Sequence, residues 1–425
     1  MNLNPPQGMR DFYPEDMLFR NYLFDKWREI SRIYGFEEFD APIVESADLF
    51  RRKSGEEIDE QIYVFKDKGG RELALRPELT PSLARLILSR IKELHFPLRW
   101  FGIVQCFRYE RAQKGRKREH YQWNVDIIGE ESPIAESEVI AAAVNVMTGL
   151  GMTSRDFKVR IGHRGILHDI LKYHECEMKY FNQICLALDK RGKIADEAIK
   201  EMLKSDGLPE SEIQKIFKIM EIRNIEEIES IIDNKSTSLN NLKELFNLLE
   251  IYNLKDFIEF DIGIIRGLAY YTGIVFEGFD VERKYRAIFG GGRYNNLLQN
   301  LGGKDLPAVG LGFGDVVIKE LLEYKNMELK TNAKPDIAIA FLSDNERDFA
   351  IKIAELIRKK GISTDLFLKP EKPKKIFSLC NKMKKRFVIL IGENEKETGS
   401  VTIKDMNSGI QEEVAINDII KKIAP

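Results

Sequence analysis

The sequence is poor in the residues that mark disulfide-linked, zinc-binding and membrane-spanning proteins. Its 425 residues include only four cysteines and five histidines. No two cysteines have the CxxC spacing of a zinc or redox site, so we expect reduced thiols in a cytoplasmic protein and no metal ion held by its side chains. The most apolar run, residues 139–152, is interrupted by Asn145, Thr148 and Gly149 and is too short to span a bilayer.

The sequence also lacks an excess of charge of one sign. Its 66 basic and 68 acidic residues give a formal net charge of −2 at pH 7. No overall basic field therefore attracts nucleic acid, and any polyanion must bind to a local patch. The N-terminal segment is polar and rich in proline, unlike the basic and apolar pattern of a signal peptide. The length is sufficient for two or three domains.

A dense polar segment, residues 101–129, stands out from this ordinary composition. Side chains alternate over residues 101–110, which predicts a strand with Arg108 and Glu110 on the same face. A polar loop with several basic side chains follows and turns at Gly115. Alternation is strict over residues 120–126, and one face of that second strand carries His120, Gln122, Asn124 and Asp126.

Two interpretations of this segment are open. An antiparallel hairpin with one solvated face is common, and alternation alone favours it. A merely solvated face would carry scattered Lys, Glu and Thr, however, whereas this face gathers fixed hydrogen-bond donors and acceptors suited to a small polar ligand. The flanking arginines suit a phosphate group, which a guanidinium binds through two hydrogen bonds.

The segment resembles motif 2 of the class II aminoacyl-tRNA synthetases, in the form used by histidyl-tRNA synthetases. The resemblance rests on Arg108 and Glu110, on the basic QKGR loop, and on the return strand. It implies that Arg108 is a catalytic group beside the α-phosphate of ATP. The other residues to which it assigns a role are Glu110, Arg116 and His120 for ATP, and Gln122 and Asp126 for histidine.

Two further segments carry the same resemblance. Residues 76–80, RPELT, match the family's RPEGT-type loop, which implies that Glu78 and Thr80 hold the ammonium group of histidine, although helix capping is an ordinary role for such a threonine. Residues 266–273, RGLAYYTG, match the highly specific histidyl signature RGLDYYTG. The match implies that Arg266 is a catalytic arginine at the α-phosphate and that Tyr271 contacts the substrate imidazole. Tyr270 is a further candidate for binding histidine, although a regular strand would direct only one of the two tyrosines at the ligand.

Two glycine-rich segments are less specific by themselves. Residues 290–294, GGGRY, suggest close approach of the backbone to a ligand or a neighbouring strand. They lack the GK[ST] of a P-loop, and the alternating glycines of residues 310–314 are a weak dinucleotide fingerprint. The resemblance identifies the two segments as the second histidyl signature and motif 3.

The sequence departs from the family pattern at three positions. Val317 stands where motif 3 usually has an arginine, Ala269 replaces an aspartate, and His120 replaces a phenylalanine that stacks on adenine. An imidazole can still stack, but the loss of an arginine leaves the terminal phosphate of ATP without its usual partner. We expect Arg111 or Arg116 to bind this part of ATP together with the Mg²⁺ that ATP brings.

The remaining patterns predict the domain organisation. We expect an α+β catalytic domain with a mainly antiparallel sheet, formed by residues 1–171 and 255–327, with a strand pair over residues 260–279. Residues 172–254 read as a helical insertion. Residues 335–425 alternate strands and helices, which predicts an α/β domain with a mostly parallel sheet. The resemblance implies that this domain binds the anticodon. Its basic run, residues 369–386, is either a solvated helix face or a patch for RNA phosphates.

The resemblance covers essentially the whole chain and implies an enzyme. Such an enzyme activates histidine with ATP to histidyl-adenylate and transfers the histidyl group to the 3′ end of tRNA(His). A helix and a strand around Pro42 resemble motif 1, which implies a homodimer. One alternative is a non-catalytic regulatory subunit of ATP phosphoribosyltransferase that senses histidine, which Val317 and Ala269 favour. A plain RNA-binding module is a second alternative, opposed by the dense polar site.

Overall fold

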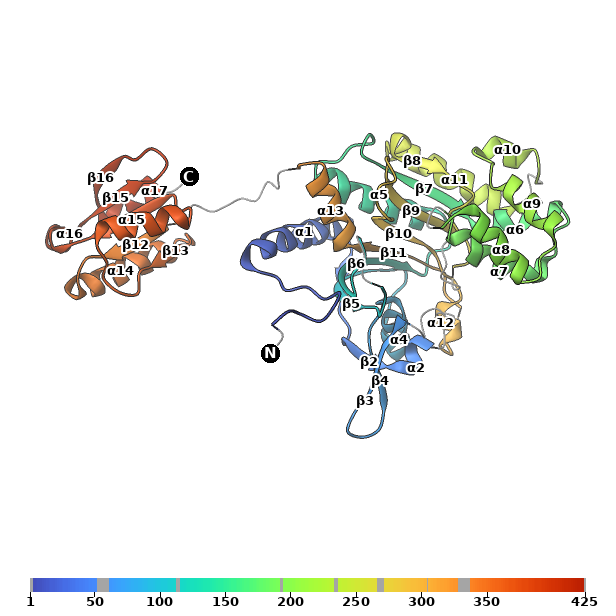
Figure 1. Cartoon of the computed structure of the whole chain (residues 1–425), viewed down its shortest axis with the longest axis horizontal. Helices are drawn as coiled ribbons and strands as arrows, with labels where there is room; N and C mark the ends of the chain where they lie inside the picture. The colour runs from blue at the N-terminus through green and yellow to red at the C-terminus, as the bar shows by residue number, and fades with distance from the viewer. Residues whose placement is uncertain are drawn as a thin grey trace. The chain divides into compact units, whose positions relative to one another are not determined.

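The computed structural model describes residues 3–51, 61–111, 115–191, 194–232, 236–265, 271–303, 305–327 and 337–423. The chain forms two compact units, Met1–Leu329 and Lys330–Pro425. Figure 1 labels the elements of both. Within the described residues, none of the helices combines the length and apolar composition needed to span a membrane.

The first unit is built around an eight-stranded sheet with the order β1-β5-β6-β11-β10-β9-β7-β8. The parallel neighbours are β1 with β5 and β7 with β8, and the other pairs are antiparallel. The sheet is therefore mainly antiparallel, as predicted. Its strands are β1 (Glu37–Glu38), β5 (Leu98–Phe107), β6 (Glu119–Ile128), β7 (Phe157–His163), β8 (Ile258–Phe260), β9 (Ile274–Asp280), β10 (Phe289–Arg293) and β11 (Ala308–Gly314).

One face of this sheet is sealed by an apolar core. The alternation of β6 directs Trp123 and Val125 into a cluster with helices α1 (Pro14–Ile33), α5 (Ile134–Gly149) and α13 (Asp315–Tyr324). The rings of Trp27 and Trp123 stack with centroids 6.4 Å apart, and Phe313 of β11 lies edge-on to Trp27. Because period-two alternation leaves only the opposite face for the polar residues of β6, the candidate site must lie there.

A smaller sheet lies beside the polar face. Strand β4 (Glu72–Leu75) pairs antiparallel with β2 (Val44–Ser46) and with β3 (Tyr63–Lys66), with which it forms a hairpin. Helices α2 (Ala47–Arg51), α4 (Thr80–Arg90) and α12 (Leu297–Asn300) accompany it. Helix α4 begins at Thr80 with Pro81 in its first turn, where proline is well accommodated.

Helices gather beyond the β7–β8 edge of the sheet (Figure 1). Buried residues of α11 and α5 belong to one continuous apolar cluster, so these helices share the core of the sheet. They occupy the segment for which the sequence predicts helical structure. They are α6 (Arg164–Tyr173), α7 (Phe181–Asp189), α8 (Asp196–Ser205), α9 (Glu210–Ile219), α10 (Ile225–Glu229) and α11 (Thr237–Ile251), with 3-10 turns at Met178–Tyr180 and Lys255–Phe257.

The strand pair predicted over residues 260–279 is wrong. Strands β8 and β9 do not pair with each other; both pair with β7, which lies between them. Gly162 of β7 permits this path, because a Cβ there would lie 2.2 Å from the carbonyl oxygen of Ile264. Arg266, Ala269 and Tyr270 lie outside the described residues.

The second unit has its own five-stranded sheet, ordered β13-β12-β14-β15-β16. Strand β12 is parallel to its neighbours β13 and β14. Strand β15 is antiparallel to its neighbours β14 and β16. The prediction of a mostly parallel sheet is therefore wrong for the last strands, which form a hairpin turned near Gly409. The elements are β12 (Ile337–Phe341), α14 (Arg347–Arg358), β13 (Thr364–Leu366), α15 (Pro373–Lys382), β14 (Phe387–Ile391), α16 (Glu393–Thr398), β15 (Ser400–Asp405), β16 (Gln411–Ala415) and α17 (Ile419–Ile423), with 3-10 turns at Asp344–Glu346 and Ile416–Asp418.

Candidate active site

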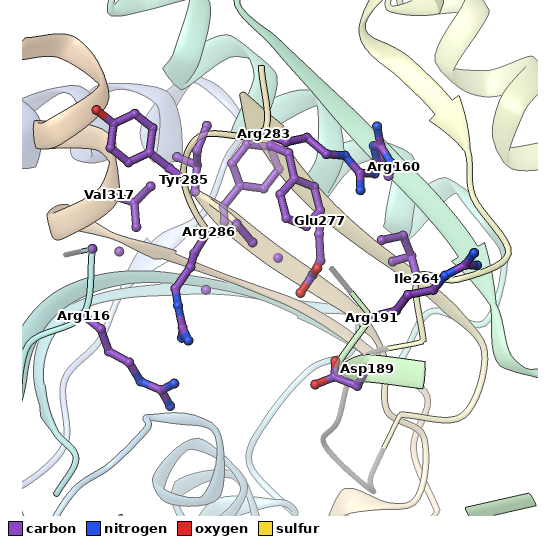
Figure 2. Close-up of a pocket in the computed structure, with 18 of the residues that line it drawn as sticks. Arg116, Arg160, Asp189, Arg191, Ile264, Glu277, Arg283, Tyr285, Arg286 and Val317 are labelled. Carbon is purple, nitrogen blue, oxygen red and sulfur yellow. The ribbon is translucent and has the colours of Figure 1, made fainter. Parts of the chain in front are cut away.

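The polar face of the large sheet opens into a cavity of about 1070 Å³. The strands β6, β9, β10 and β11, helix α13 and the helical segment after α6 all contribute to its walls. Figure 2 shows charged side chains that reach into it from several sides. The walls are rich in arginine, including Arg108, Arg116, Arg160, Arg191 and Arg286. A space of this size and charge suits a polyanionic ligand larger than an amino acid.

Bare backbone forms the floor under the polar side chains of β6. Strand β11 places Gly310 beside Asp126 and Gly312 beside Asn124. A Cβ at Gly310 would lie 2.1 Å from Oδ1 of Asp126, and one at Gly312 would lie 2.0 Å from Nε2 of Gln122. The alternating glycines are therefore required because the side chains of β6 lean over the neighbouring strand.

An inner pocket of about 40 Å³ adjoins this floor. It brings together most of the residues predicted to bind histidine, from three distant parts of the sequence. The polar side chains that line it are Glu78, Thr80, Arg108, Gln122, Asn124, Asp126, Tyr271 and Tyr294. The predicted constellation thus forms one site, apart from Tyr270, which lies outside the described residues.

The charge balance of the inner pocket favours a ligand that donates hydrogen bonds. Asp126 is 2% exposed and accepts a hydrogen bond from the Tyr294 hydroxyl, while its Oδ2 is buried without a partner. Oδ1 of Asn124 is likewise buried without a partner. Burial, with the charge of Glu78 adding to it, raises the pKa of Asp126 to about 7, although the hydrogen bond from Tyr294 opposes the shift. A bound ligand that donates hydrogen bonds would give Oδ2 of Asp126 and Oδ1 of Asn124 the partners that they lack.

The predicted ATP-binding residues that the structure describes line the large cavity, and Arg108 lines the inner pocket as well. Strand β5 ends at Phe107, so Arg108 and Glu110 follow the strand instead of belonging to it. Nε of Arg108 donates to the carbonyl of Pro77 at 3.0 Å, which orients the guanidinium. Glu110 forms an ion pair with Arg116, and both line the cavity. Burial, with Arg108 nearby, lowers the pKa of His120 to about 3, so this ring is neutral at pH 7 and available for stacking.

The basic loop contributes only part of its charge to the cavity. Arg116 and Lys117 line it, whereas Arg111 does not. Arg118 turns away, because its Nε donates to the carbonyl of Glu110 at 3.0 Å and its guanidinium lies 4.2 Å from the Tyr109 ring centroid. Of the two arginines expected to bind the tail of ATP, only Arg116 is placed to do so.

Arg10, near the N-terminus, links strand β6 to helix α13. Nε of Arg10 donates to Glu119 at 2.5 Å, and its Nη1 donates to Asp315 at 2.9 Å. Asp315, at the start of α13, also accepts from the backbone N–H of Tyr121 at 2.9 Å. Burial raises the pKa of Asp315, and the charge of Arg10 opposes that shift. The sequence analysis missed Arg10, because no local pattern links it to acids more than 100 residues away.

The GGGRY segment has functions that its composition did not reveal. Arg293 is buried and its Nε donates to Glu136 at 2.6 Å, an ion pair that joins β10 to α5. The carbonyl of Arg293 accepts from the N–H of Thr272 at 2.8 Å and so fixes the segment next to Tyr271. The hydroxyl group of Tyr294 donates a hydrogen bond to the carboxylate of Asp126. None of these contacts follows from the sequence alone, which placed Asn124 on the polar face of β6 without a specific role and gave no role to Arg286.

A mainly antiparallel sheet with helices on one face, and a small polar pocket beside an arginine-rich cavity on the other, is the arrangement of a class II aminoacyl-tRNA synthetase. Comparison with known proteins narrows this class. A family model described as histidyl-tRNA synthetase matches residues 8–314, and one described as anticodon binding domain matches residues 336–424.

Two relatives match nearly the whole chain. The chloroplastic/mitochondrial histidine–tRNA ligase of Arabidopsis thaliana is 43% identical over 99% of this chain and 86% of its own length. The histidine–tRNA ligase of Pyrococcus horikoshii is 39% identical over 98% of this chain and 97% of its own length. The histidyl-tRNA synthetase structure from a Nostoc species has a TM-score of 0.83 at 22% identity and covers 100% of this chain and 99% of its own, which supports the fold alone. The chain therefore belongs to the histidyl-tRNA synthetase family.

Proposed function

We propose that this protein is a histidine–tRNA ligase, which activates histidine with ATP and transfers the histidyl group to the 3′ end of tRNA(His). The observation that carries the proposal is the inner pocket, where buried acceptors of Asp126 and Asn124 lie beside an arginine-rich cavity. The family resemblance supports the reaction, and the pocket supports the amino acid.

Histidine would be recognised at both of its polar ends. Glu78 and Thr80, at the start of α4, would hold the ammonium group, and Gln122 would also contact histidine. Asp126 would accept a hydrogen bond from a ring N–H, with Tyr271 at the other ring nitrogen. An amino acid without these ring nitrogens would leave Oδ2 of Asp126 buried without a partner, which costs enough to reject it without an editing step.

Adenylation would depend on alignment and charge neutralisation. The histidine carboxylate is already ionised at pH 7, so attack on the α-phosphorus needs no general base. Arg108 lines both the inner pocket and the cavity, which supports a role for it where the two substrates would meet. Together with Arg266 it would stabilise charge on the α-phosphate, while Mg²⁺ arrives as the complex of ATP. Glu110 would bind the adenosine part, with His120 stacked on adenine.

Transfer to tRNA would use the second unit as well. We assign residues 1–171 and 255–327 to the catalytic domain, residues 172–254 to a helical insertion, and residues 335–425 to anticodon binding. Lys375 of α15 pairs with Glu371 at 2.6 Å, whereas Lys374 and Lys382 of the same helix, and Lys372 just before it, are exposed. Exposed cations of this kind suit RNA phosphates.

We also propose a homodimer formed through the small sheet. Ile43 and Val44 lie next to Pro42 and are exposed, and so are Val64 and Phe65 on β3 of the same sheet. Apolar side chains gathered on one exposed sheet favour a protein interface. A partner with the same patch would cover it by two-fold symmetry.

The regulatory alternative has less support. A Bacillus halodurans structure titled as an ATP phosphoribosyltransferase regulatory subunit/histidyl-tRNA synthetase has a TM-score of 0.76 at 25% identity and covers 92% of this chain and 99% of its own. The near full-length relatives at higher identity are ligases. Val317 is one of the two features that favoured a regulator, with Ala269, and it removes a single charge from a cavity that retains many others.

The proposal is tested by charging a tRNA(His) transcript with labelled histidine. We expect ATP-dependent charging by the wild type and none when another amino acid replaces histidine. Glu78→Gln is the matched variant, since it keeps the shape of the side chain and removes its charge; it should raise the KM for histidine. Tight histidine binding without adenylate or charged tRNA would instead establish the regulator.

A further inference from the structure

Helix α13 supplies no free cation to the cavity beside Val317. Its only basic residue within Asp315–Tyr324 is Lys319, which pairs with Asp16 at 3.2 Å and lies over the ring of Phe19. Val317 lines the cavity, and a Cβ on Gly115 of the basic loop would lie 3.7 Å from it. A polyphosphate in this part of the cavity must therefore find its positive partners on another element.

The turn between β9 and β10 is held against α13. The Asp280 carboxylate accepts the backbone N–H groups of Lys284 at 2.9 Å and of Tyr285 at 3.0 Å, which fixes the path of the turn. The Tyr324 hydroxyl donates to Glu282 at 3.1 Å, and the Lys284 ammonium lies 3.3 Å from the Tyr324 ring centroid. The residue that follows this anchored stretch is Arg286, and it lines the cavity.

Arg286 presents an uncompensated charge to that space. In the part of the chain that the structure describes, no ion pair involves Arg286, although Arg283 of the same turn lies 3.6 Å from Asp261 and packs on Phe279. Figure 2 shows the side chains of Arg286 and Arg116 extending into the same part of the cavity, below Val317 in this view. Arg283 points toward Arg160 instead.

We propose that Arg286 binds the terminal phosphates of ATP together with Arg116, and so replaces the arginine that α13 lacks at Val317. The inference rests on the proposed function, because it takes ATP as the ligand. A triphosphate tail supplies several oxygen atoms for bidentate hydrogen bonds, so it can bind both Arg286, which has no ion pair among the described residues, and Arg116, which also pairs with Glu110. The turn is anchored on α13, so Arg286 can occupy the space that an arginine on α13 would fill.

The test compares nucleotides with and without the tail. Calorimetry on the full-length Arg286→Met variant should show an ATP dissociation constant raised by about tenfold or more, the scale of one charge-assisted hydrogen bond. The dissociation constant for AMP, which lacks the tail, should stay within about twofold of the wild-type value. Arg283→Met is the matched control, because the same turn and the same chemistry are changed at a residue already paired with Asp261; it should leave both constants unchanged.

A rescue experiment separates a specific contact from a general electrostatic effect. Adding Val317→Arg to Arg286→Met should restore most of the affinity for ATP, because a guanidinium returns to the same space from α13. Equal weakening of ATP and AMP, or equal effects of the two arginine variants, would overturn the assignment. These binding measurements do not require catalysis, so they still decide on Arg286 if the wild type proves unable to make adenylate.

Discussion

Replacing Asp126 by asparagine should stabilise the empty protein while it weakens histidine binding. The carboxyl group is buried and has one orphan oxygen, and its pKa rises from 3.8 to about 7. A folded state that holds the proton more tightly than the unfolded state loses stability as the pH rises from about 4 to about 7, and no further above that. The variant lacks this ionisation, so its advantage over the wild type should grow through the same window.

The magnitude follows from the shift. At pH 8 the raised pKa lowers the free energy of unfolding of the wild type by about 4 kcal/mol, and at pH 5 it lowers it by less than about 2 kcal/mol. With an unfolding entropy of about 2.1 cal/mol/K per residue over a unit of roughly 330 residues, these costs correspond to about 6 °C and about 2 °C in Tm. The wild type and the variant are compared without histidine, because a bound histidine would pair with the carboxylate and remove its destabilising effect.

The assay is thermal unfolding of both proteins from pH 5 to pH 8.5 without ligands, followed by histidine titration at pH 8. The Tm difference should increase with pH and level off above pH 7.5, and the variant should bind histidine about tenfold more weakly or worse. A variant that is less stable than the wild type at pH 8, or a Tm difference that does not change with pH, would show that Asp126 is ionised and satisfied in the empty pocket.

Three further predictions concern other parts of the site. Arg266→Ala should lower adenylation by about a hundredfold or more while histidine affinity changes little; near-normal pyrophosphate exchange in the folded variant would remove this residue from catalysis. Asn124→Leu should raise the KM for histidine by about tenfold, since its buried oxygen lines the inner pocket, with the KM for ATP unchanged; equal changes in both constants would indicate a packing defect. A protein truncated after residue 330 should still form adenylate but charge tRNA poorly; unimpaired charging at physiological salt would make the basic run of residues 369–386 a solvated face.

The sequence was most informative where function depends on local strand periodicity. Alternation in β6 correctly placed Gln122 and Asp126 on one face, because a two-residue period is a property of the strand itself. The family resemblance then connected that face with Glu78, Thr80 and Tyr271, which periodicity could not relate to it. The structure brings these residues into one pocket.

The misses all depend on contacts between distant segments. No local pattern could show that β7 separates β8 from β9, or that a turn packed on α13 points Arg286 into the cavity. Arg10 meets acids of β6 and α13 only after the sheet has formed. Even the triple glycine of β10 has a tertiary cause, since a Cβ on Gly291 would lie 2.0 Å from the carbonyl oxygen of Gly310 on β11, and one on Gly292 would lie 2.6 Å from that of Ile274 on β9.

The central claim is tested most directly by histidine-dependent exchange of pyrophosphate into ATP by the purified wild-type protein. We expect exchange that requires histidine and Mg²⁺ and that survives despite valine at position 317. Absence of exchange by a folded protein that binds histidine would contradict the claim and identify the chain as a histidine sensor instead of a ligase.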